Sequence, residues 1–94
     1  MKAASLVTEM AIGFTGSPII EFYVTLPSDS YKYYIGRIAY INDGEEFVWS
    51  IHEPSDEHPY AVAGKDSIHR TGTMRNTESN RMSIISRFYN LFTI

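Results

Sequence analysis

The chain contains no cysteine, and this absence excludes several kinds of site at once. It rules out disulfides, thiolate zinc sites and cysteine nucleophiles. The fold of these 94 residues must therefore depend on a hydrophobic core without covalent staples, and a chain of this length is just large enough to form one. We expect a single domain over residues 1–94.

Long apolar runs are missing as well. The segment from Met1 to Glu9 contains one lysine, but Thr8 and Glu9 interrupt any apolar stretch. No segment has the continuous apolar length that a membrane span requires. We therefore expect a cytoplasmic protein with no secretory signal and no membrane contact.

The sequence also lacks the motifs of known active sites. Serine, histidine and aspartate occur, but no Gly-x-Ser-x-Gly frame holds them. The glycines at 13–16 and 72–74 do not have the spacing of dinucleotide-binding or phosphate-binding loops. The prediction is a protein that is not an enzyme and that has no cofactor.

What the sequence does contain is a strong β-hairpin signal over residues 31–53. Two alternating apolar runs flank residues 42–45, where Asp43-Gly44 favours a type I′ turn with positive φ at both central residues. Directly opposed residues share a face of a sheet. The predicted pairs are Tyr40 with Phe47, Ile38 with Trp49, and Gly36 with Ile51.

This register divides the hairpin into two faces. The apolar face, which we expect in the core, contains Tyr34, Gly36, Ile38, Tyr40, Phe47, Trp49 and Ile51. The opposite face contains Ile35, Arg37, Ala39, Ile41, Glu46, Val48, Ser50 and His52.

Residues 19–26 predict a second strand, because apolar residues alternate and β-branched and aromatic types dominate. A four-residue loop at 27–30 would place the strand's alternating apolar set on the face opposite Ile38 and Trp49. A one-residue slip inverts every side chain of a strand. We therefore expect a loop of odd length or a bulge near Ser30.

Two other segments are ambiguous. The apolar residues of 6–14 fit a helix except at Ile12, and they fit a strand except at Thr8; we favour the strand. Residues 54–76 have no periodicity, and only 60–63 and 67–69 are candidate short strands. A connection this long is often functional when ordered, but a mobile excursion is an equal alternative.

The segment from Glu78 to Leu91 has the periodicity of an amphipathic helix, with Asn76 or Thr77 as the N-cap. Its apolar residues form two neighbouring lines: Met82, Ile85, Tyr89 and Phe92, and beside them Ile84, Phe88 and Leu91. The predicted fold is α+β: an antiparallel β-meander of about four strands with this helix packed on one face.

Charge is unevenly distributed, although the net charge is only −3. One stretch contains six acids and no base: Asp43, Glu45, Glu46, Glu53, Asp56 and Glu57. Such a cluster can attract a partner protein with a basic surface, or it can be a solvated surface around a neutral core. We predict it as a partner-binding acidic patch.

A second candidate surface combines tyrosine and arginine, the types enriched where interfaces carry their binding energy. It contains Tyr23, Tyr31, Tyr33 and Arg37. The alternative is that another segment covers these side chains and that they are buried.

Metal and nucleic-acid sites have weaker support. The stretch 52–58 contains two histidines and three acids, but Pro54 interrupts a helix there and the spacing is not His-Glu-x-x-His, so no metal site is predicted. A nucleic-acid surface would need the bases after residue 65: His69, Arg70, Arg75, Arg81 and Arg87, with Tyr31 or Tyr33 for stacking. Arg81 and Arg87 are about 240° apart on a helix and form no stripe.

The predicted function is non-enzymatic protein binding, by a small inhibitor or regulator that docks on a larger partner. Phages and mobile elements use small proteins of this kind against host machinery, anti-CRISPR proteins included. That expectation concerns a class of proteins and rests on no particular residue. The alternatives are a nucleic-acid-binding regulator and a small metal-dependent enzyme.

Overall fold

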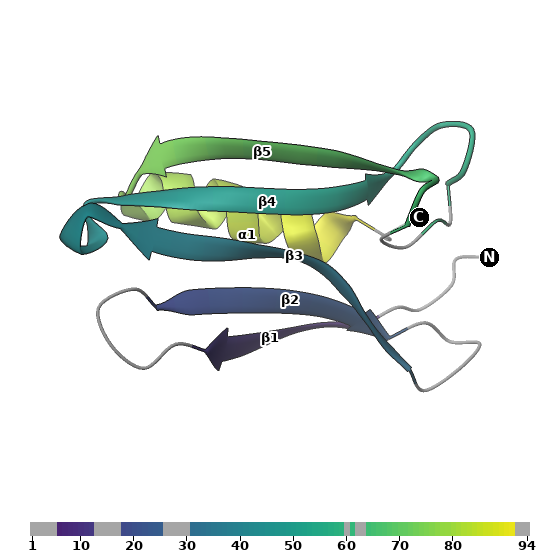
Figure 1. Ribbon diagram of the computed structural model, residues 1–94, viewed down its shortest axis with the longest axis horizontal. Helices are drawn as coiled ribbons and strands as arrows, with labels where there is room; N and C mark the ends of the chain where they lie inside the picture. The colour runs from purple at the N-terminus through teal and green to yellow at the C-terminus, as the bar shows by residue number, and fades with distance from the viewer. Residues whose placement is uncertain (1–5, 13–17, 26–30, 60, 62–63, 92–94) are drawn as a thin grey trace.

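The computed structural model describes residues 6–12, 18–25, 31–59, 61 and 64–91. Five strands form one antiparallel sheet in the order of the sequence, and one α-helix follows them (Figure 1). The elements are β1 (Leu6–Ile12), β2 (Ile19–Thr25), β3 (Lys32–Ile41), β4 (Glu46–Pro54), β5 (Ser67–Arg75) and α1 (Glu78–Asn90). The α+β meander is confirmed, with five strands rather than about four.

The hairpin of β3 and β4 has the predicted register, with Gly36 opposite Ile51, Ile38 opposite Trp49 and Tyr40 opposite Phe47. At its tip, Asp43 and Gly44 have φ angles of 57° and 84°. The Glu45 N–H donates to the Asn42 carbonyl oxygen at 3.1 Å. The Asp-Gly pair thus has the positive φ angles that the sequence predicts, but Asn42 also has a positive φ of 53°, and the tip is a short 3-10 helix, η1 (Asn42–Gly44).

β3 contains one extra residue where it pairs with β2. Phe22 lies opposite Gly36, but its neighbour Tyr23 lies opposite Tyr34, so Ile35 has no partner in β2. Because side chains alternate along a strand, this bulge inverts the faces of the residues on one side of it relative to the other. The apolar residues of β2 and of the β3–β4 hairpin consequently share one face.

The predicted faces of β3 are therefore wrong at two positions. Ile35, expected on the polar face, is fully buried. Tyr34, expected in the core, lies on the opposite face, where its ring contacts Tyr23 and His52. The expected irregularity exists, but at Ile35 rather than near Ser30, which lies outside the described residues.

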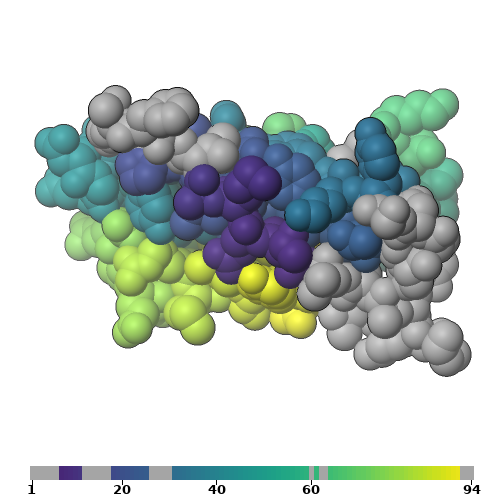
Figure 2. All heavy atoms as spheres, turned by 90° about the horizontal axis from the view of Figure 1, so that it is seen from below, coloured from purple at the N-terminus to yellow at the C-terminus, as the bar shows by residue number. Residues whose placement is uncertain are grey.

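α1 packs against one face of the sheet (Figures 1 and 2). The ring of Phe88 stacks on Phe22 with centroids 4.0 Å apart and planes at 5°. The helix begins after the expected cap, because the Thr77 hydroxyl oxygen accepts from the Asn80 N–H at 3.1 Å. The core between helix and sheet contains Val7, Phe22, Val24, Ile35, Ile38, Phe47, Ile51, Ile84 and Phe88.

The line of α1 with Ile84 and Phe88 forms the buried part of this core, and Ile85 of the other line packs against it. Ile84 and Phe88 are buried, whereas Met82 and Tyr89 are 61% and 42% exposed. The Tyr89 hydroxyl donates to Glu9 of β1 at 2.6 Å, and this bond raises the pKa of Tyr89 to about 12. The outer line thus contributes a polar contact to the first strand.

β5 is longer than its sequence pattern indicates. It extends over nine residues in an unbroken register with β4, although only residues 67–69 are predicted as a strand. Most of its side chains are exposed, so it has no apolar alternation to detect. The preference for a strand over residues 6–12 is confirmed by β1, and the other candidate short strand, 60–63, lies largely outside the described residues.

Removing the stacked ring should destabilise the fold strongly. Phe88→Ala is expected to lower the free energy of unfolding by about 3–5 kcal/mol, because it leaves a cavity against Phe22. Met82→Ala, on the exposed side of the same helix, should change it by less than about 0.5 kcal/mol. Urea unfolding of both variants measures the difference, and equal losses would contradict the orientation of α1.

Gly36 should tolerate no side chain. Its φ is 147°, and a Cβ atom there would lie 2.1 Å from the Ser50 carbonyl oxygen and 2.6 Å from the Phe88 ring. Gly36→Ala is expected to cost about 2–5 kcal/mol, from backbone strain together with overpacking. Gly44→Ala is the control, because its φ is also positive but no atom lies within 4 Å of the added Cβ. Similar losses in urea unfolding for the two variants would contradict the close approach of the Ser50 backbone and the Phe88 ring to Gly36.

Candidate functional site

The face of the sheet that points away from α1 carries no described helix or strand, because all five strands belong to one sheet and α1 packs on its other side (Figure 1). We call this surface the open face. Antiparallel sheets commonly present polar side chains on such a face. Here the central side chains are Glu21 and Tyr23 of β2, Tyr34 and Arg37 of β3, Ser50 and His52 of β4, and His69 and Thr71 of β5.

Four aromatic side chains form a row across the open face, and we call them the aromatic row. The Tyr23 and Tyr34 rings meet edge to face with centroids 5.9 Å apart, and Tyr34 meets His52 in the same way at 6.0 Å. His52 stacks on His69 at 4.5 Å. The row therefore connects β2, β3, β4 and β5, and it exists because the bulge turns Tyr34 to this face.

Hydrogen bonding and burial keep the two phenols of the row neutral. The Tyr23 hydroxyl donates to Glu21 Oε1 at 2.6 Å, and this bond raises the pKa of Tyr23. Burial raises the pKa of Tyr34, with the charge of Glu21 adding to the effect and that of Arg37 opposing it. The tyrosine half of the row can thus offer apolar ring surface at neutral pH.

In the histidine half of the row, the environment lowers a pKa instead of raising it. Burial lowers the pKa of His52, and charge on His69 lowers it further. Ser50 Oγ and His69 Nε2 share a hydrogen bond of 2.6 Å. A serine–histidine contact of this length is one part of a nucleophilic site, but His69 is exposed on an open surface rather than enclosed in a cleft.

The open face carries more unpaired positive than negative charge. Within the described part of the chain, Lys32, Arg37 and Arg75 form no ion pair. The two carboxylates of this face are engaged, Glu21 by the Tyr23 hydroxyl and Glu46 by the side-chain amide of Asn42. In the sheet register Arg37 lies opposite Glu21 and Arg75 lies opposite Glu46, so a partner on this face would meet three cations and two carboxylates, although the whole chain has a net charge of −3.

The structure divides the predicted tyrosine and arginine surface. Tyr23 and Arg37 lie on the open face, as expected for a free surface. Tyr33 packs against the core on the side of α1, and the Tyr31 ring contacts Tyr33 at 5.4 Å. Tyr31 is 69% exposed. The bulge explains the division, because it exchanges the faces of neighbouring residues in β3.

Sequence reasoning missed the other members of the aromatic row. His52 is assigned to the correct face of the hairpin, but its neighbour His69 belongs to a strand predicted over only three residues. The one available signal is the weak alternation of His69, Thr71 and Thr73 with Ile68 and Arg70. The contact itself follows from the register in which His52 pairs with His69.

The acids of the predicted acidic patch lie at the two ends of β4 (Figure 1). Asp43, Glu45 and Glu46 are at the hairpin tip, and Asp56 and Glu57 follow the opposite end of the strand. A strand of this length separates the two groups by about 25–30 Å. The structure therefore does not gather these carboxylates into one patch.

Glu53, the sixth acid, is engaged on the helix side of the sheet. Its side chain is 17% exposed, and Arg87 Nη2 donates to its two oxygens at 3.1 and 3.2 Å. Arg70 Nε donates to the same carboxylate. The Arg87 guanidinium also lies 5.4 Å from the centre of the Trp49 ring. This cluster connects β4, β5 and α1, and we assign it to the fold.

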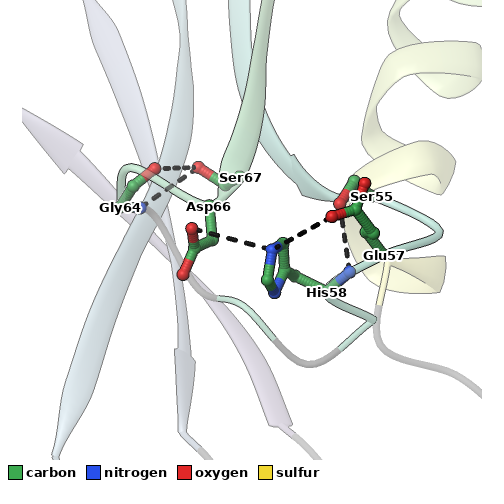
Figure 3. Close-up of polar contacts among 6 residues, drawn as sticks. All are labelled: Ser55, Glu57, His58, Gly64, Asp66 and Ser67. Carbon is green, nitrogen blue, oxygen red and sulfur yellow. Dashed lines mark hydrogen bonds and ion pairs between the residues drawn. The ribbon is translucent and has the colours of Figure 1, made fainter.

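The loop between β4 and β5 contains the second histidine of the 52–58 stretch. His58 Nε2 lies 3.9 Å from the Glu57 carboxylate and 3.8 Å from that of Asp66 (Figure 3). Ser55 Oγ accepts from the His58 N–H, and Ser67 Oγ bonds to the backbone of Gly64. Among the residues that the structure describes, no group of three or more His, Cys, Asp or Glu side chains is placed to hold a metal ion.

A shallow hollow of about 480 Å³ lies beside the hairpin tip. Its lining is Pro18, Tyr40, Asp43, Gly44 and Asn76. The Asn76 side-chain amide donates to the Gly44 carbonyl oxygen at 2.6 Å, so this polar group holds the tip in place. As a candidate functional site, this hollow is weaker than the open face.

Comparisons with protein-family models, with curated proteins and with solved structures find no match to this chain. The helix that the structure describes is too short to cross a membrane. The open face is therefore the feature from which a function can be argued.

Protonation of His52 should weaken the fold. In the unfolded chain His52 has its ordinary pKa of 6.5, and in the folded chain the pKa is lower. The unfolded state therefore binds the proton first as the pH falls, and stability is complete above about pH 6.5 and decreases below it. We expect the melting temperature to fall between about pH 7 and pH 5.

The variant His52→Gln should lose part of this pH dependence, and His58→Gln in the exposed loop is the control. Thermal unfolding monitored by circular dichroism across the same range measures it. A slope in His52→Gln as steep as that of the unmodified protein would contradict the role of His52.

Proposed function

We propose that this protein is a non-enzymatic protein-binding module that docks on a larger partner through the open face. The observation that supports this is the aromatic row, beside the unpaired Arg37, on a face without a covering element. Tyrosine and arginine are enriched among the residues that dominate binding energy. A sheet face that contacts only water does not require a row of aromatic side chains.

The partner is proposed to present an acidic surface. The cations Lys32, Arg37 and Arg75 form no ion pair within the described chain and outnumber Glu21 and Glu46 on the open face, and burying them against an uncharged surface would be costly. Carboxylates on the partner would supply the missing pairs and would also accelerate association. The acidic stretch is the weaker docking candidate, because its members lie at two ends of β4 and Glu53 is engaged with Arg70 and Arg87.

The size of the open face fits this role. Five strands about 4.8 Å apart and about 25 Å long present about 600 Å². Stable complexes bury about 800 Å² on each partner, so contacts beside the sheet would complete an interface of ordinary size. A module of this kind acts by occupying a surface of its partner, which is the mode of an inhibitor or regulator.

Single-stranded nucleic acid is the second candidate, because aromatic side chains on an open sheet with nearby cations can also stack bases. Two observations make it the weaker one. Tyr23, Tyr34 and His52 meet edge to face, so they do not form one flat stacking platform. The net charge of −3 also opposes a polyanion.

Affinity capture from cells that naturally contain the protein tests the proposal. The affinity-tagged protein, Tyr34→Ala, Arg37→Glu and Lys65→Glu are compared, with captured proteins quantified by mass spectrometry. Tyr34→Ala and Arg37→Glu should each reduce capture of the partner about tenfold, the effect of losing a central interface residue. Lys65→Glu, an exposed charge reversal in the turn before β5, should leave capture unchanged.

Two results would redirect the proposal. Loss of capture after replacing Glu45 and Asp56 by amides, with Arg37→Glu still active, would assign docking to the acidic ends of β4. Tight binding of an oligodeoxythymidylate of about 20 nucleotides, lost in Arg37→Glu, would favour the nucleic-acid candidate.

A further inference from the structure

We propose that β5 is a self-association edge, through which two copies of this chain pair antiparallel about a two-fold axis. β5 ends the sheet on one side, and no described element lies beyond it. It is nine residues long and its register with β4 is unbroken, so it contains no bulge that would turn its outer side away. It also contains no proline, and regular edges without such protection are ready templates for another strand.

The backbone groups available on this edge can be identified. The Ser67 N–H is bonded to Gly64 and the Arg75 carbonyl oxygen to the Thr77 N–H, both outside the β4–β5 ladder. Groups of alternate residues point the same way in an antiparallel strand. The remaining outward groups between these two ends are therefore those of His69, Thr71 and Thr73.

A two-fold axis beside Thr71 would place all of these backbone groups in hydrogen-bonded pairs with the second copy. It places Thr71 opposite Thr71 of the second copy, and His69 opposite the second copy's Thr73. All these pairs are of the hydrogen-bonded type, and together they form about six backbone hydrogen bonds. Threonine pairs directly across a sheet are also favourable.

The side chains fit the same register on the helix side. Ile68, which is 37% exposed, lies opposite Met74 of the second copy. Arg70 lies opposite Gly72 on this side, and on the open face Arg75 lies opposite Ser67, so no like charges oppose each other directly. The other edge is less suited, because pairing β1 about its centre would place Glu9 against Glu9.

The pairing is expected to be weak. An edge of about 30 Å buries far less surface than a standard interface, so association should appear at about 10–500 μM. Both open faces then lie on the same side of one continuous sheet. The inference does not depend on the proposed partner, because it uses the edge of the sheet rather than its open face.

Sedimentation velocity across that concentration range tests the proposal. The unmodified protein should shift from monomer to dimer. Thr71→Lys and Thr71→Glu should each weaken association at least tenfold, because like charges then meet at the axis, and an equimolar mixture of the two should associate again. Thr71→Val, which loses the hydroxyl bond to Trp49 without adding charge, is the matched control and should still dimerise.

Several outcomes would overturn the pairing: a monomer throughout the range, charge variants that dimerise as the unmodified protein does, or a mixture that stays monomeric. A second measurement covers variants that fold poorly. Thr71→Cys introduces the chain's single cysteine, and opposed residues about 5.5 Å apart are within disulfide range. Mild oxidation should yield a covalent dimer from Thr71→Cys but not from Thr8→Cys on β1, and equal yields would contradict the axis.

Discussion

One inserted residue in β3 determines which side chains this protein buries and which it presents. If the register that pairs Thr25 with Lys32 continued without the bulge, Phe22 would lie opposite Ile35, and the apolar residues of β2 would face away from those of β4. The bulge brings both sets to one face. Beside it, Gly36 has no side chain, so the Phe88 ring can reach the sheet and stack on Phe22. The core and the open face are two results of the same insertion.

The two faces use their charges differently. On the helix side, Glu53 holds Arg70 and Arg87 in one cluster, and Glu9 accepts from Tyr89. These groups are satisfied within the chain. On the open face the two carboxylates are engaged by neutral donors, and the cations form no ion pair within the described residues. The proposed docking surface rests on this contrast together with the aromatic row.

The parts of the fold that the sequence predicts are those with local signals. Asp43-Gly44 allows few turn geometries, so the register of the hairpin follows from it, and the Thr77 cap with helical periodicity defines α1. The position of the bulge could not be predicted, because Tyr34 and Ile35 are both residue types that occur in a core. β5 is a strand mainly because β4 offers it an edge, a tertiary cause that exposed polar residues do not reveal. One of the four residues of the aromatic row, His69, lies on that strand, so the contact of His52 with His69 could not be predicted, whereas Tyr23 and Arg37 could be.

The order of elements along the chain also has a consequence for how the protein folds. Each strand pairs with its neighbour in sequence, so every step of sheet assembly closes only a short loop at little entropic cost. The helix that covers the apolar face comes after all five strands. During synthesis the growing sheet therefore displays Phe22, Phe47 and Ile51 until Phe88 has left the ribosome. During this interval the nascent chain exposes apolar surface, which favours aggregation.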